Sequence, residues 1–414
     1  MKRCIRSIAL RTVTVLCVIA VLTACASQPY RFESSVQPVI EQRAKQQELG
    51  AFRVRASVPG DDEAKALFGI PLHKNGIQAV WLEIENLGDK RARFAPYSLD
   101  KTYFPPHDVA YINKKRVSKQ GLAELESRLL SVSIPRTIPP GQTVSGYVFT
   151  HASKGTKAFN VDIHYAYGEG ENEHFTFFIT VPGFTPDHAE VDFQGLYTAD
   201  QVQDLGPDDF RALLGDWVCC TTNSTGDAHG RPVNVVLIAE GLDVLQALLR
   251  AGWSETSYER SDNYLNNSDY YFDRVPDAVF RKGRQKGREQ LEIALWIAPA
   301  RLEGKTVWML QFRHAIGRFF DIGDYFFGKR LDPDVNQGRN YFLQDMWYSQ
   351  SLLALAWSES TKYVPEDSPQ IDFNNNAWFS DGYRLVLWLS GEPVALTVAK
   401  NRHWDKIGPH RKSP

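Results

Sequence analysis

Hydrophobic and polar residues alternate along positions 50–183 in short runs that turn residues separate. The clearest alternation covers 52–56, 77–86, 144–149, 159–167 and 174–181. A period of two places apolar side chains on one face of a strand, and the Pro and Gly residues between the runs suit turns. The pattern therefore predicts an antiparallel β-sandwich over 50–183, with one helical insertion over 118–130.

Beyond residue 216 the pattern changes to apolar strands that helices follow. The uninterrupted apolar run at 233–238 predicts a strand that is buried on both faces. Leucines recur at helical spacing within 242–251 and predict a helix that stops at Gly252. The remaining predictions are strands at 290–298, 307–314 and 383–389 and a long amphipathic helix at 336–357. This order predicts an α/β domain over 217–400.

The segments outside these two domains are polar. Positions 25–49 contain several Gln residues and are typical of a tether, whereas 184–216 carries turn residues and one short helix at 207–214, as in a linker. Positions 401–414 are expected to form a polar tail. The whole chain of 414 residues is therefore predicted to be a multidomain α+β protein.

Charge and composition exclude one class of partner. The formal net charge is -2, and no long block of like charges is present. A chain without a basic surplus gives no electrostatic argument for nucleic acid or for acidic lipid, and we expect no nucleic-acid partner. Aromatic residues make up 12% of the chain, and most lie inside apolar runs, where we expect them to fill cores.

The first 26 residues have the composition of an export signal. Basic residues precede an apolar run at 8–22, and the run leads into Leu22-Thr23-Ala24-Cys25. The run is too early and too short for a stable membrane span, and small residues before Cys25 suit a signal peptidase. We therefore predict a signal peptide over 1–24. The alternatives are a transmembrane anchor or a plain signal peptide with a fortuitous Cys.

Leu-Thr-Ala-Cys resembles the lipobox of bacterial lipoproteins. The resemblance implies that Cys25 receives diacylglycerol, becomes the mature N-terminus and carries three acyl chains, palmitate among them, which is enough for stable membrane attachment. Ala26 stands where an Asp would retain a lipoprotein at the inner membrane of a Gram-negative cell. The resemblance thus implies an outer membrane lipoprotein that faces the periplasm, with the inner membrane as the less favoured location.

Two cysteines remain after processing, and they are adjacent. Cys219 and Cys220 lie about 3.8 Å apart at their Cα atoms, below the usual disulfide range of about 4.4–6.8 Å. The default expectation is therefore two thiols on successive strand positions that face opposite sides. A vicinal disulfide is the alternative. The nearby His229 does not complete a recognisable Cys/His metal spacing, so no metal site and no cofactor are expected.

The order of motifs in the second domain resembles the LssY C-terminal domain family. The matching motifs are the Cys-Cys-Thr-Thr-Asn-Ser-Thr-Gly at 219–226, the Pro-Val-Asn-Val-Val-Leu-Ile at 232–238, the Ala-Gly-Trp at 251–253 and the Leu-Asp-Pro-Asp-Val at 331–335. The resemblance implies a domain of this type without an established reaction. The chain departs from the family at 313–317, where an Asp is missing, and at 336–339, which is less acidic than usual.

A second, broader resemblance concerns the first domain. The short strands and the Pro-Pro-Gly-Gln turn at 139–142 resemble immunoglobulin-like modules of exported bacterial proteins. The resemblance implies an immunoglobulin-like sandwich over 50–183.

One group of charged residues has the composition of a reactive or binding site. The candidate acid/base residues are His314, Asp332 and Asp334, and the candidate ligand-binding residues are Arg313, Arg318 and Arg339. Carboxylates and a His suit proton transfer, and Arg forks suit a bidentate phosphate or carboxylate. The alternative is structural, because Asp332-Pro333-Asp334 before a helix provides carboxylates that cap backbone N–H groups.

These observations lead to two hypotheses. The first is a non-catalytic envelope lipoprotein that presents the second domain to an envelope protein or a lipid-phosphate ligand. The second is an enzyme or phosphate-binding domain that acts on envelope lipid or glycan precursors. A single concave pocket around the charged group would favour the second, whereas dispersal into caps and ion pairs would favour the first.

Overall fold

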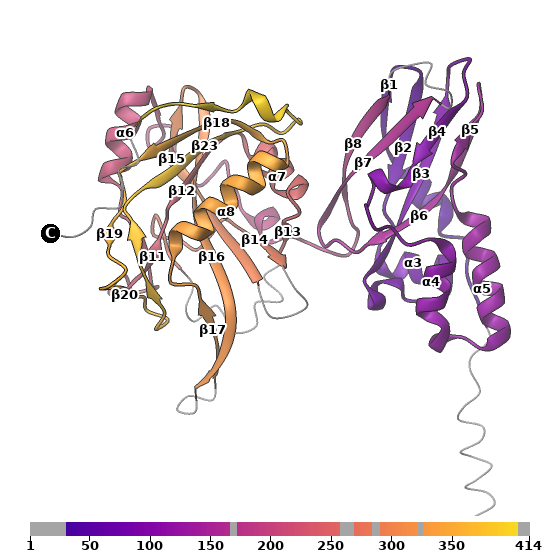
Figure 1. The fold of residues 1–414 in the computed structure, drawn as a ribbon, viewed down its shortest axis with the longest axis horizontal. Coiled ribbons are helices and arrows are strands. Elements are labelled where there is room, and N and C mark those ends of the chain that lie inside the picture. The colour runs from indigo at the N-terminus through magenta and orange to yellow at the C-terminus, as the bar shows by residue number, and fades with distance from the viewer. Residues whose placement is uncertain (1–29, 166–171, 257–268, 284–289, 322–325, 405–414) are drawn as a thin grey trace, which may run out of the picture. The chain divides into compact units, whose positions relative to one another are not determined.

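A computed structural model describes residues 30–165, 172–256, 269–283, 290–321 and 326–404, with the backbone alone described at 318–321 and 326–329. Cys25 and the predicted signal peptide lie outside the described residues. The chain divides into two compact units (Figure 1). The first unit is Met1–Ala152 with Phe159–Gly183, and the second is Ser153–Ala158 with Phe184–Pro414.

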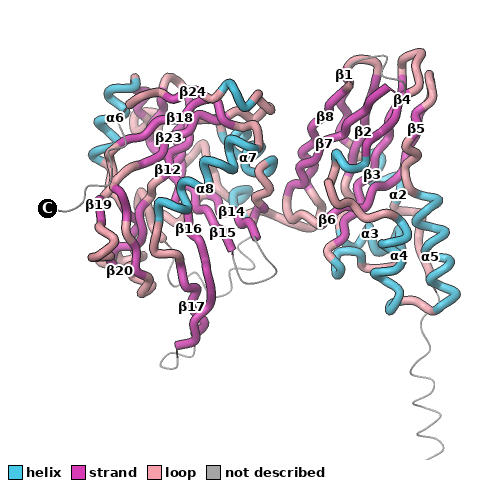
Figure 2. The backbone as a smooth tube through the Cα atoms, in the orientation of Figure 1, coloured by secondary structure: helices cyan, strands magenta, loops and turns pink. Residues whose placement is uncertain are grey.

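The described strands of the first unit form two four-stranded antiparallel sheets (Figure 2). The first sheet has the order β1-β2-β3-β6, and its strands are β1 (Lys45–Leu49), β2 (Phe52–Ser57), β3 (Ile77–Asn86) and β6 (Thr143–His151). The second has the order β5-β4-β7-β8, and its strands are β4 (Ala92–Ala95), β5 (Thr137–Ile138), β7 (Thr156–Tyr165) and β8 (Glu173–Thr180). The predicted strands are therefore present, whereas the immunoglobulin-like assignment stays a prediction.

The first sheet is apolar on both faces, because each face has its own partner. One face packs against the second sheet through side chains such as Val54, Leu82 and Phe177. The other face, with Trp81 and Phe149, packs against helices. These helices are α2 (Gln37–Gln42), α3 (Asp61–Phe68), α4 (Pro106–Asn113) and α5 (Lys119–Val132). Only α5, which Ser118 caps, corresponds to the predicted helical insertion.

The tether predicted over 25–49 is wrong at 37–42 and 45–49. Residues 37–42 form α2, whose Ile40 is fully buried in the helix-side core. Residues 45–49 form β1, which pairs with β2. The side chains of β1 are exposed, so its polar composition resembles that of a tether, although its backbone is bound in a sheet.

The described residues of the second unit form a ten-stranded, mostly antiparallel sheet around β15 (Gln290–Leu302) and β16 (Lys305–Asp321). Its main path is β13-β14-β15-β16-β12-β23-β18-β24, with β17 (Phe326–Leu331) beside β16 and β9 (Gln203–Leu205) beside β15. The other strands are β12 (Val235–Ile238), β13 (Ser254–Glu255), β14 (Ala278–Gly283), β18 (Leu352–Ser358), β23 (Arg384–Leu389) and β24 (Lys400–Asn401). The parallel strand pairing that is typical of an α/β domain is present between β12 and β23. Most other pairs in the sheet are antiparallel, as between β15 and β16.

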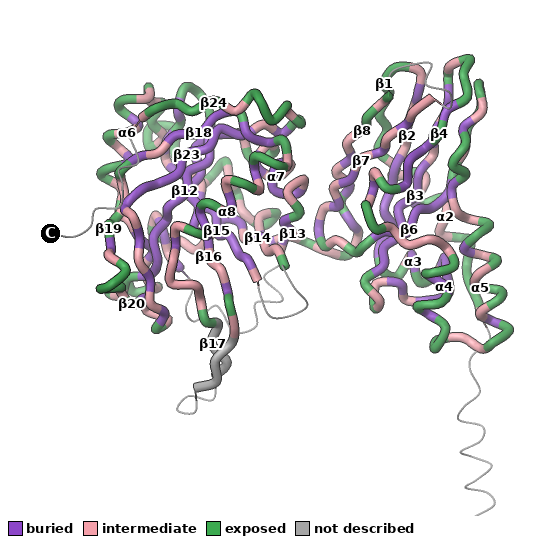
Figure 3. Tube along the Cα trace, in the orientation of Figure 1, coloured by how far each residue is buried: buried purple, intermediate pink, exposed green. Residues whose placement is uncertain are grey.

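Helices cover both faces of this sheet. The helices α7 (Gly241–Arg250) and α8 (Val335–Tyr348) pack on the face that contains Val235 and Leu237, and α6 (Pro207–Asp216) packs on the face that contains Val236. We call these two cores the α8-side core and the α6-side core. The central strands β12 and β23 are therefore buried throughout (Figure 3), as the continuous apolar run at 233–238 predicted for β12.

Short strand pairs cover one end of the sheet. They are β10 (Cys220–Thr222) with β11 (His229–Pro232), β19 (Tyr363–Val364) with β22 (Ser380–Asp381), and β20 (Gln370–Ile371) with β21 (Ala377–Trp378). These strands and their connections contribute several buried polar side chains, namely Thr221, Arg231, Asp372, Asn376 and Ser380.

Three boundary predictions for the second unit are wrong. The helix expected over 336–357 ends at Tyr348, because 352–358 pairs with β23 as a strand. The expected linker 184–216 belongs to the second unit, since Phe210 of α6 is buried in the α6-side core. The expected tail also begins inside the fold, where Trp404 contacts Trp388. In the described ranges, no helix is long and apolar enough to cross a membrane.

Candidate functional site

The candidate residues Arg313 and His314 point to opposite faces of the sheet. Both lie on β16, where side chains alternate between the two faces. Met309 of the same strand belongs to the α6-side core and Phe312 belongs to the α8-side core, so the odd-numbered Arg313 lies on the first side and the even-numbered His314 on the second. The two side chains therefore cannot share one small ligand.

Arg313 forms ion pairs with two carboxylates at the polar end of the α6-side core. Its Nη1 donates to Asp269 Oδ2 at 2.8 Å, and its Nη2 lies 3.1 Å from Glu292 Oε1. The other oxygen of Glu292 accepts from Arg281 Nε at 2.7 Å. Two Arg and two carboxylates thus alternate in one partly buried chain, in which each charge is balanced by a neighbour.

Asp269 connects this chain to a fully buried hydrogen-bond network. Thr221 donates from Oγ1 to Asp269 Oδ1 at 2.6 Å. Gln311 donates from Nε2 to the same Thr221 oxygen at 3.1 Å and to the carbonyl of Arg231 at 3.0 Å. A Cβ on Gly230 would lie 2.2 Å from Thr221 Oγ1, so only glycine permits this approach of β11. Burial raises the pKa of Asp269, although Arg313 and Thr221 oppose the shift.

Arg231 is a buried cation that donates hydrogen bonds to three residues. Its side chain is only 4% exposed. It donates from Nε to Asp372 Oδ2 at 3.1 Å, from Nη1 to the carbonyl of Asp332 at 2.7 Å, and from Nη2 to the carbonyl of Ala377 at 2.7 Å. One guanidinium therefore joins β11 to two segments that are far apart in the sequence, one at Asp332 and one at 372–377. Burial lowers the pKa of Arg231, and Asp372 acts in the opposite direction.

His314 and the two acidic candidates lie beside the N-terminus of α8. The Nδ1 atom of His314 is 3.1 Å from Asp332 Oδ2. Asp332 accepts the backbone N–H of Asp334 through Oδ1, and Asp334 caps α8 by accepting from the backbone N–H of Asn336, both at 3.0 Å. Asp334 therefore has the structural role that the sequence offered as an alternative, which is that of a helix cap. Among the described residues, His314 Nε2 is buried without a hydrogen-bond partner.

Arg339 belongs to a separate arrangement. It is 2% exposed and forms a bidentate pair with Asp381, at 2.8 Å and 2.6 Å, and it donates to the carbonyl of Tyr383 at 2.6 Å. Its guanidinium also lies 4.7 Å from the ring centre of Trp357. Arg318 is a β16 residue whose side chain lies outside the described part of the structure. The candidates thus separate into an Arg313 chain, a His314–Asp332 pair, a helix cap and the Arg339–Asp381 pair.

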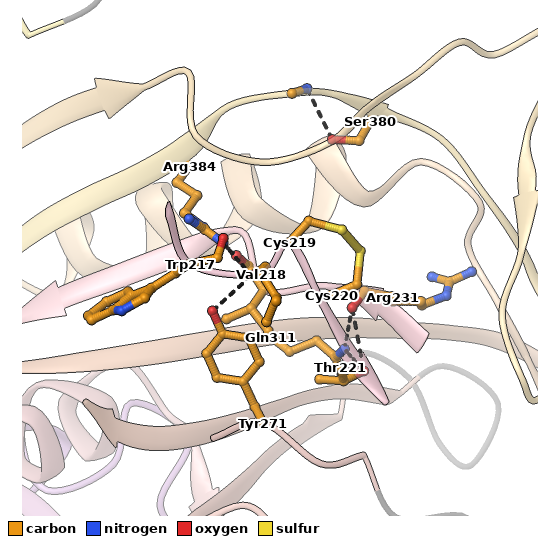
Figure 4. The surroundings of a disulfide bond; sticks show 12 residues. Trp217, Val218, Cys219, Cys220, Thr221, Arg231, Tyr271, Gln311, Ser380 and Arg384 are labelled. Atoms are coloured by element: carbon orange, nitrogen blue, oxygen red, sulfur yellow. Dashed lines mark hydrogen bonds between the residues drawn. A yellow bond between two sulfur atoms is a disulfide. The ribbon is translucent and has the colours of Figure 1, made fainter. Parts of the chain in front are cut away.

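Cys219 and Cys220 form a disulfide, so the default expectation of two thiols is wrong. The expectation assumed that both lie on one strand, whereas β10 begins at Cys220 and Cys219 precedes it. Figure 4 shows the disulfide with Arg384 and Val218 on one side of it and Thr221 and Arg231 on the other. The bridge joins neighbouring residues and closes no long loop, so it adds little constraint to the unfolded chain.

Arg384 is fully buried and binds backbone carbonyls. It donates to Val233 at 3.0 Å, to Trp217 at 3.4 Å, to Val218 at 2.8 Å and also to Leu214. Leu214 lies in the last turn of α6, where carbonyls have no partners within the helix and a cation is favoured. Arg384 therefore fixes the end of α6 and the segment that leads to the disulfide.

Sequence reasoning missed Arg231, Asp269, Asp372 and Arg384. A signal was available for Arg384, because a charge that begins the apolar run at 384–389 is expected to be buried with partners. No comparable signal marks Asp269 or Asp372, which lie in polar segments. The described residues contain no group of three or more His, Cys, Asp or Glu side chains that could hold a metal ion.

The raised pKa of Asp269 predicts a pH dependence that Asp269→Asn removes. As the pH rises from about 4 through the raised pKa, the unfolded carboxyl is already ionised, whereas the folded one must ionise in a buried site. The free energy of unfolding of the wild type, minus that of the variant, should therefore fall with rising pH, by up to about 1.4 kcal/mol per pH unit in this window. Urea denaturation at a series of pH values measures this difference, and a flat or rising curve would contradict the prediction.

Comparison with known proteins identifies the second unit. Residues 215–383 match the family model described as LssY C-terminus. Among solved structures, the chain is similar to one titled as "a putative lipoprotein (ycdA) from Bacillus subtilis subsp. subtilis str. 168", with 14% identity over 60% of this chain and 72% of that chain. The TM-score is 0.19, so this similarity carries no argument. No curated protein matches the chain. The second unit therefore contains an LssY C-terminus domain, as the sequence motifs indicated.

Proposed function

We propose that the protein is a lipoprotein of the bacterial cell envelope, anchored through Cys25 in the outer membrane, whose second unit is a non-catalytic binding domain in the periplasm. The first unit, with two antiparallel sheets around one core, would be an immunoglobulin-like module between the anchor and this domain. The partner would be an envelope protein or a ligand with a lipid-phosphate group.

One observation supports the non-catalytic role above the others. The charged candidates for which side chains are described are held by contacts within the domain, and β16 directs Arg313 and His314 to opposite faces. Asp334 is engaged as a helix cap, and both carboxylate oxygens of Asp381 bind Arg339. A catalytic carboxylate or His must instead reach substrate in a shared site. The arrangement therefore favours a structural role for these side chains.

The enzyme or phosphate-binding alternative has one specific observation in its favour. The buried Nε2 of His314 is without a partner among the described residues, while Nδ1 lies beside Asp332. A carboxylate that orients an imidazole in this way is common in acid/base sites. A deletion strain that expresses the His314→Ala, Asp332→Ala double variant tests this alternative. If the variant folds normally and restores the full wild-type phenotype, the enzyme is excluded.

The anchor is tested by metabolic labelling with palmitate. The wild type should incorporate label and fractionate with the outer membrane, whereas Cys25→Ser should incorporate none, since its side chain cannot form the thioether. Cys17→Ser is the matched control, because this Cys lies within the predicted signal peptide and its loss should leave labelling unchanged. Equal labelling of Cys25→Ser, or no labelling of the wild type, would refute the anchor.

A further inference from the structure

We propose that one end of the first unit rests on an anionic phospholipid surface beside the lipid anchor. This basic end consists of Tyr111, Ile112, Lys114, Lys115, Arg116 and Lys119, at the end of α4, the turn after it and the start of α5. The inference rests on the proposed lipidation of Cys25. It goes beyond the proposed function because it assigns the protein a second, non-covalent contact with the membrane. This contact would fix the orientation of the first unit relative to the membrane.

The basic end exposes apolar and cationic groups together. Tyr111 is 65% exposed and Ile112 is 41% exposed, although they occupy successive positions of a helix that buries Val109 and Ala110. Large apolar side chains exposed beside cations are typical of surfaces that bind the membrane interface, where Tyr rings and Lys side chains both find suitable surroundings. The Nζ of Lys114 lies 3.5 Å from the ring centre of Tyr111, so the aromatic and the charge form one unit.

The charge of this end is positive and faces outward. Residues 106–121 contain four basic side chains, which are exposed, and one acidic side chain, Asp108. The nearest carboxylates on α5 have local partners: Glu124 accepts from Gln120, and Glu126 contacts His107. Anionic lipid headgroups attract clusters of Lys and Arg that lie within a Debye length, about 8 Å at physiological ionic strength. The complementarity thus favours an anionic membrane as occupant.

The covalent chain holds this end close to the proposed anchor. Tyr30 begins the described chain and packs at the start of α5, where a Cβ on Gly121 would lie 3.2 Å from the Cβ of Tyr30. Four residues lie between Cys25 and Tyr30, and the five residue steps that join them span at most about 18 Å. A lipidated Cys25 therefore keeps Tyr30, and with it the start of α5, within about 18 Å of the bilayer surface.

The basic end also has a fixed shape. Asn113 is fully buried between α4 and the neighbouring turn, donates to the carbonyl of Val109 at 2.9 Å and accepts from Asn75 at 2.7 Å. These bonds hold the last turn of α4 and hence the directions of Tyr111 and Ile112. A preformed surface does not lose conformational entropy on contact with the membrane, which favours stable docking.

The inference is tested with the lipidated, purified full-length protein in vesicles. Cysteine replaces either Ile112 or Leu87 and is labelled with an environment-sensitive fluorophore, since Cys25 is acylated and the remaining cysteines are bridged. Leu87 is the matched control: it is 46% exposed and follows β3 at the end opposite to Asn75, about 30 Å away along the ten residues of the strand. The vesicles contain phosphatidylcholine alone or with phosphatidylglycerol.

We expect the label at 112, but not at 87, to show blue-shifted emission in vesicles that contain phosphatidylglycerol. Adding Lys114→Glu, Lys115→Glu and Arg116→Glu should abolish the shift, as should 1 M salt, in which the Debye length falls to about 3 Å. Circular dichroism verifies that the triple variant is folded. Equal emission at 112 and 87, or a shift that survives the triple variant, would overturn the inference.

Flotation of the same samples separates this result from the anchor itself. Protein that floats with vesicles but shows no shift at 112 retains the anchor and loses the docking surface. Protein that does not float contradicts the lipid anchor and therefore also the proposed docking surface. A shift in phosphatidylcholine alone, of equal size, would also overturn the inference, because it would show that charge has no part.

Discussion

Replacing Arg231 with Met is expected to lower the free energy of unfolding of the second unit by about 3–5 kcal/mol. The substitution leaves the buried carboxylate of Asp372 without its cation, and it leaves the carbonyls of Asp332 and Ala377 without a donor. An uncompensated buried charge is among the most destabilising defects that a single substitution produces. Urea denaturation of the full-length protein, followed by tryptophan fluorescence, measures the change.

A second substitution distinguishes the charge from the packing. Asp372 also accepts the backbone N–H groups of Asn374 and Asn376, both at 2.9 Å, and an Asn at 372 retains an oxygen for these bonds. Adding Asp372→Asn should therefore recover part of the lost stability. Arg301→Met is the control, because that side chain is 46% exposed and its contacts are long, at 3.7 Å to Glu240 Oε2 and 3.5 Å to Thr306 Oγ1, so we expect a loss below about 1 kcal/mol. Equal losses for Arg231 and Arg301 would refute the prediction.

Replacing Arg384 with Met is expected to cost about 2–4 kcal/mol. No carboxylate is left behind, but the carbonyls of Leu214, Trp217, Val218 and Val233 lose a buried donor, and each unsatisfied group costs about 1–3 kcal/mol before the structure relaxes. Relief of the buried charge offsets part of this loss, since burial lowers the pKa of Arg384. The expected loss is therefore smaller than at Arg231.

Hydrogen exchange locates the effect of Arg384→Met. The amides of α6 and of the segment up to Cys219 should exchange faster, because Arg384 fixes the end of that helix. Arg384→Lys should recover little, since one ammonium group cannot reach four carbonyls that a planar guanidinium spans. Unchanged exchange in α6, or full recovery by Lys, would show that Arg384 does not hold this segment.

The local pattern of apolar and polar residues predicted the elements that are buried on both faces or along one stripe. The run at 233–238 became the central strand β12, and the leucine spacing at 242–251 became α7, because burial on two faces or on one stripe leaves a clear periodicity. The helix expected at 336–357 was half wrong. The apolar residues of 352–358 suit either a helix stripe or a buried strand, and pairing with β23 decides between them.

The candidate site shows the same division. The opposite directions of Arg313 and His314 follow from strand alternation and were within reach of the sequence. Their partners were not. Asp269 lies 44 residues before Arg313, and Asp372 lies 141 residues after Arg231, so only the folded chain brings these charges together.

The sequence by itself determined the positions of the central strands of the second unit, the motifs of its LssY C-terminus domain and the lipobox-like Cys25, since each is a local pattern of side chains. The tertiary structure decided that positions 37–49 belong to the first unit, that Cys219 and Cys220 are bridged, and that the charged candidates separate into distinct structural contacts. The physical reason is that ion pairing, capping and strand pairing depend on distances between segments, which a linear pattern of residues does not contain.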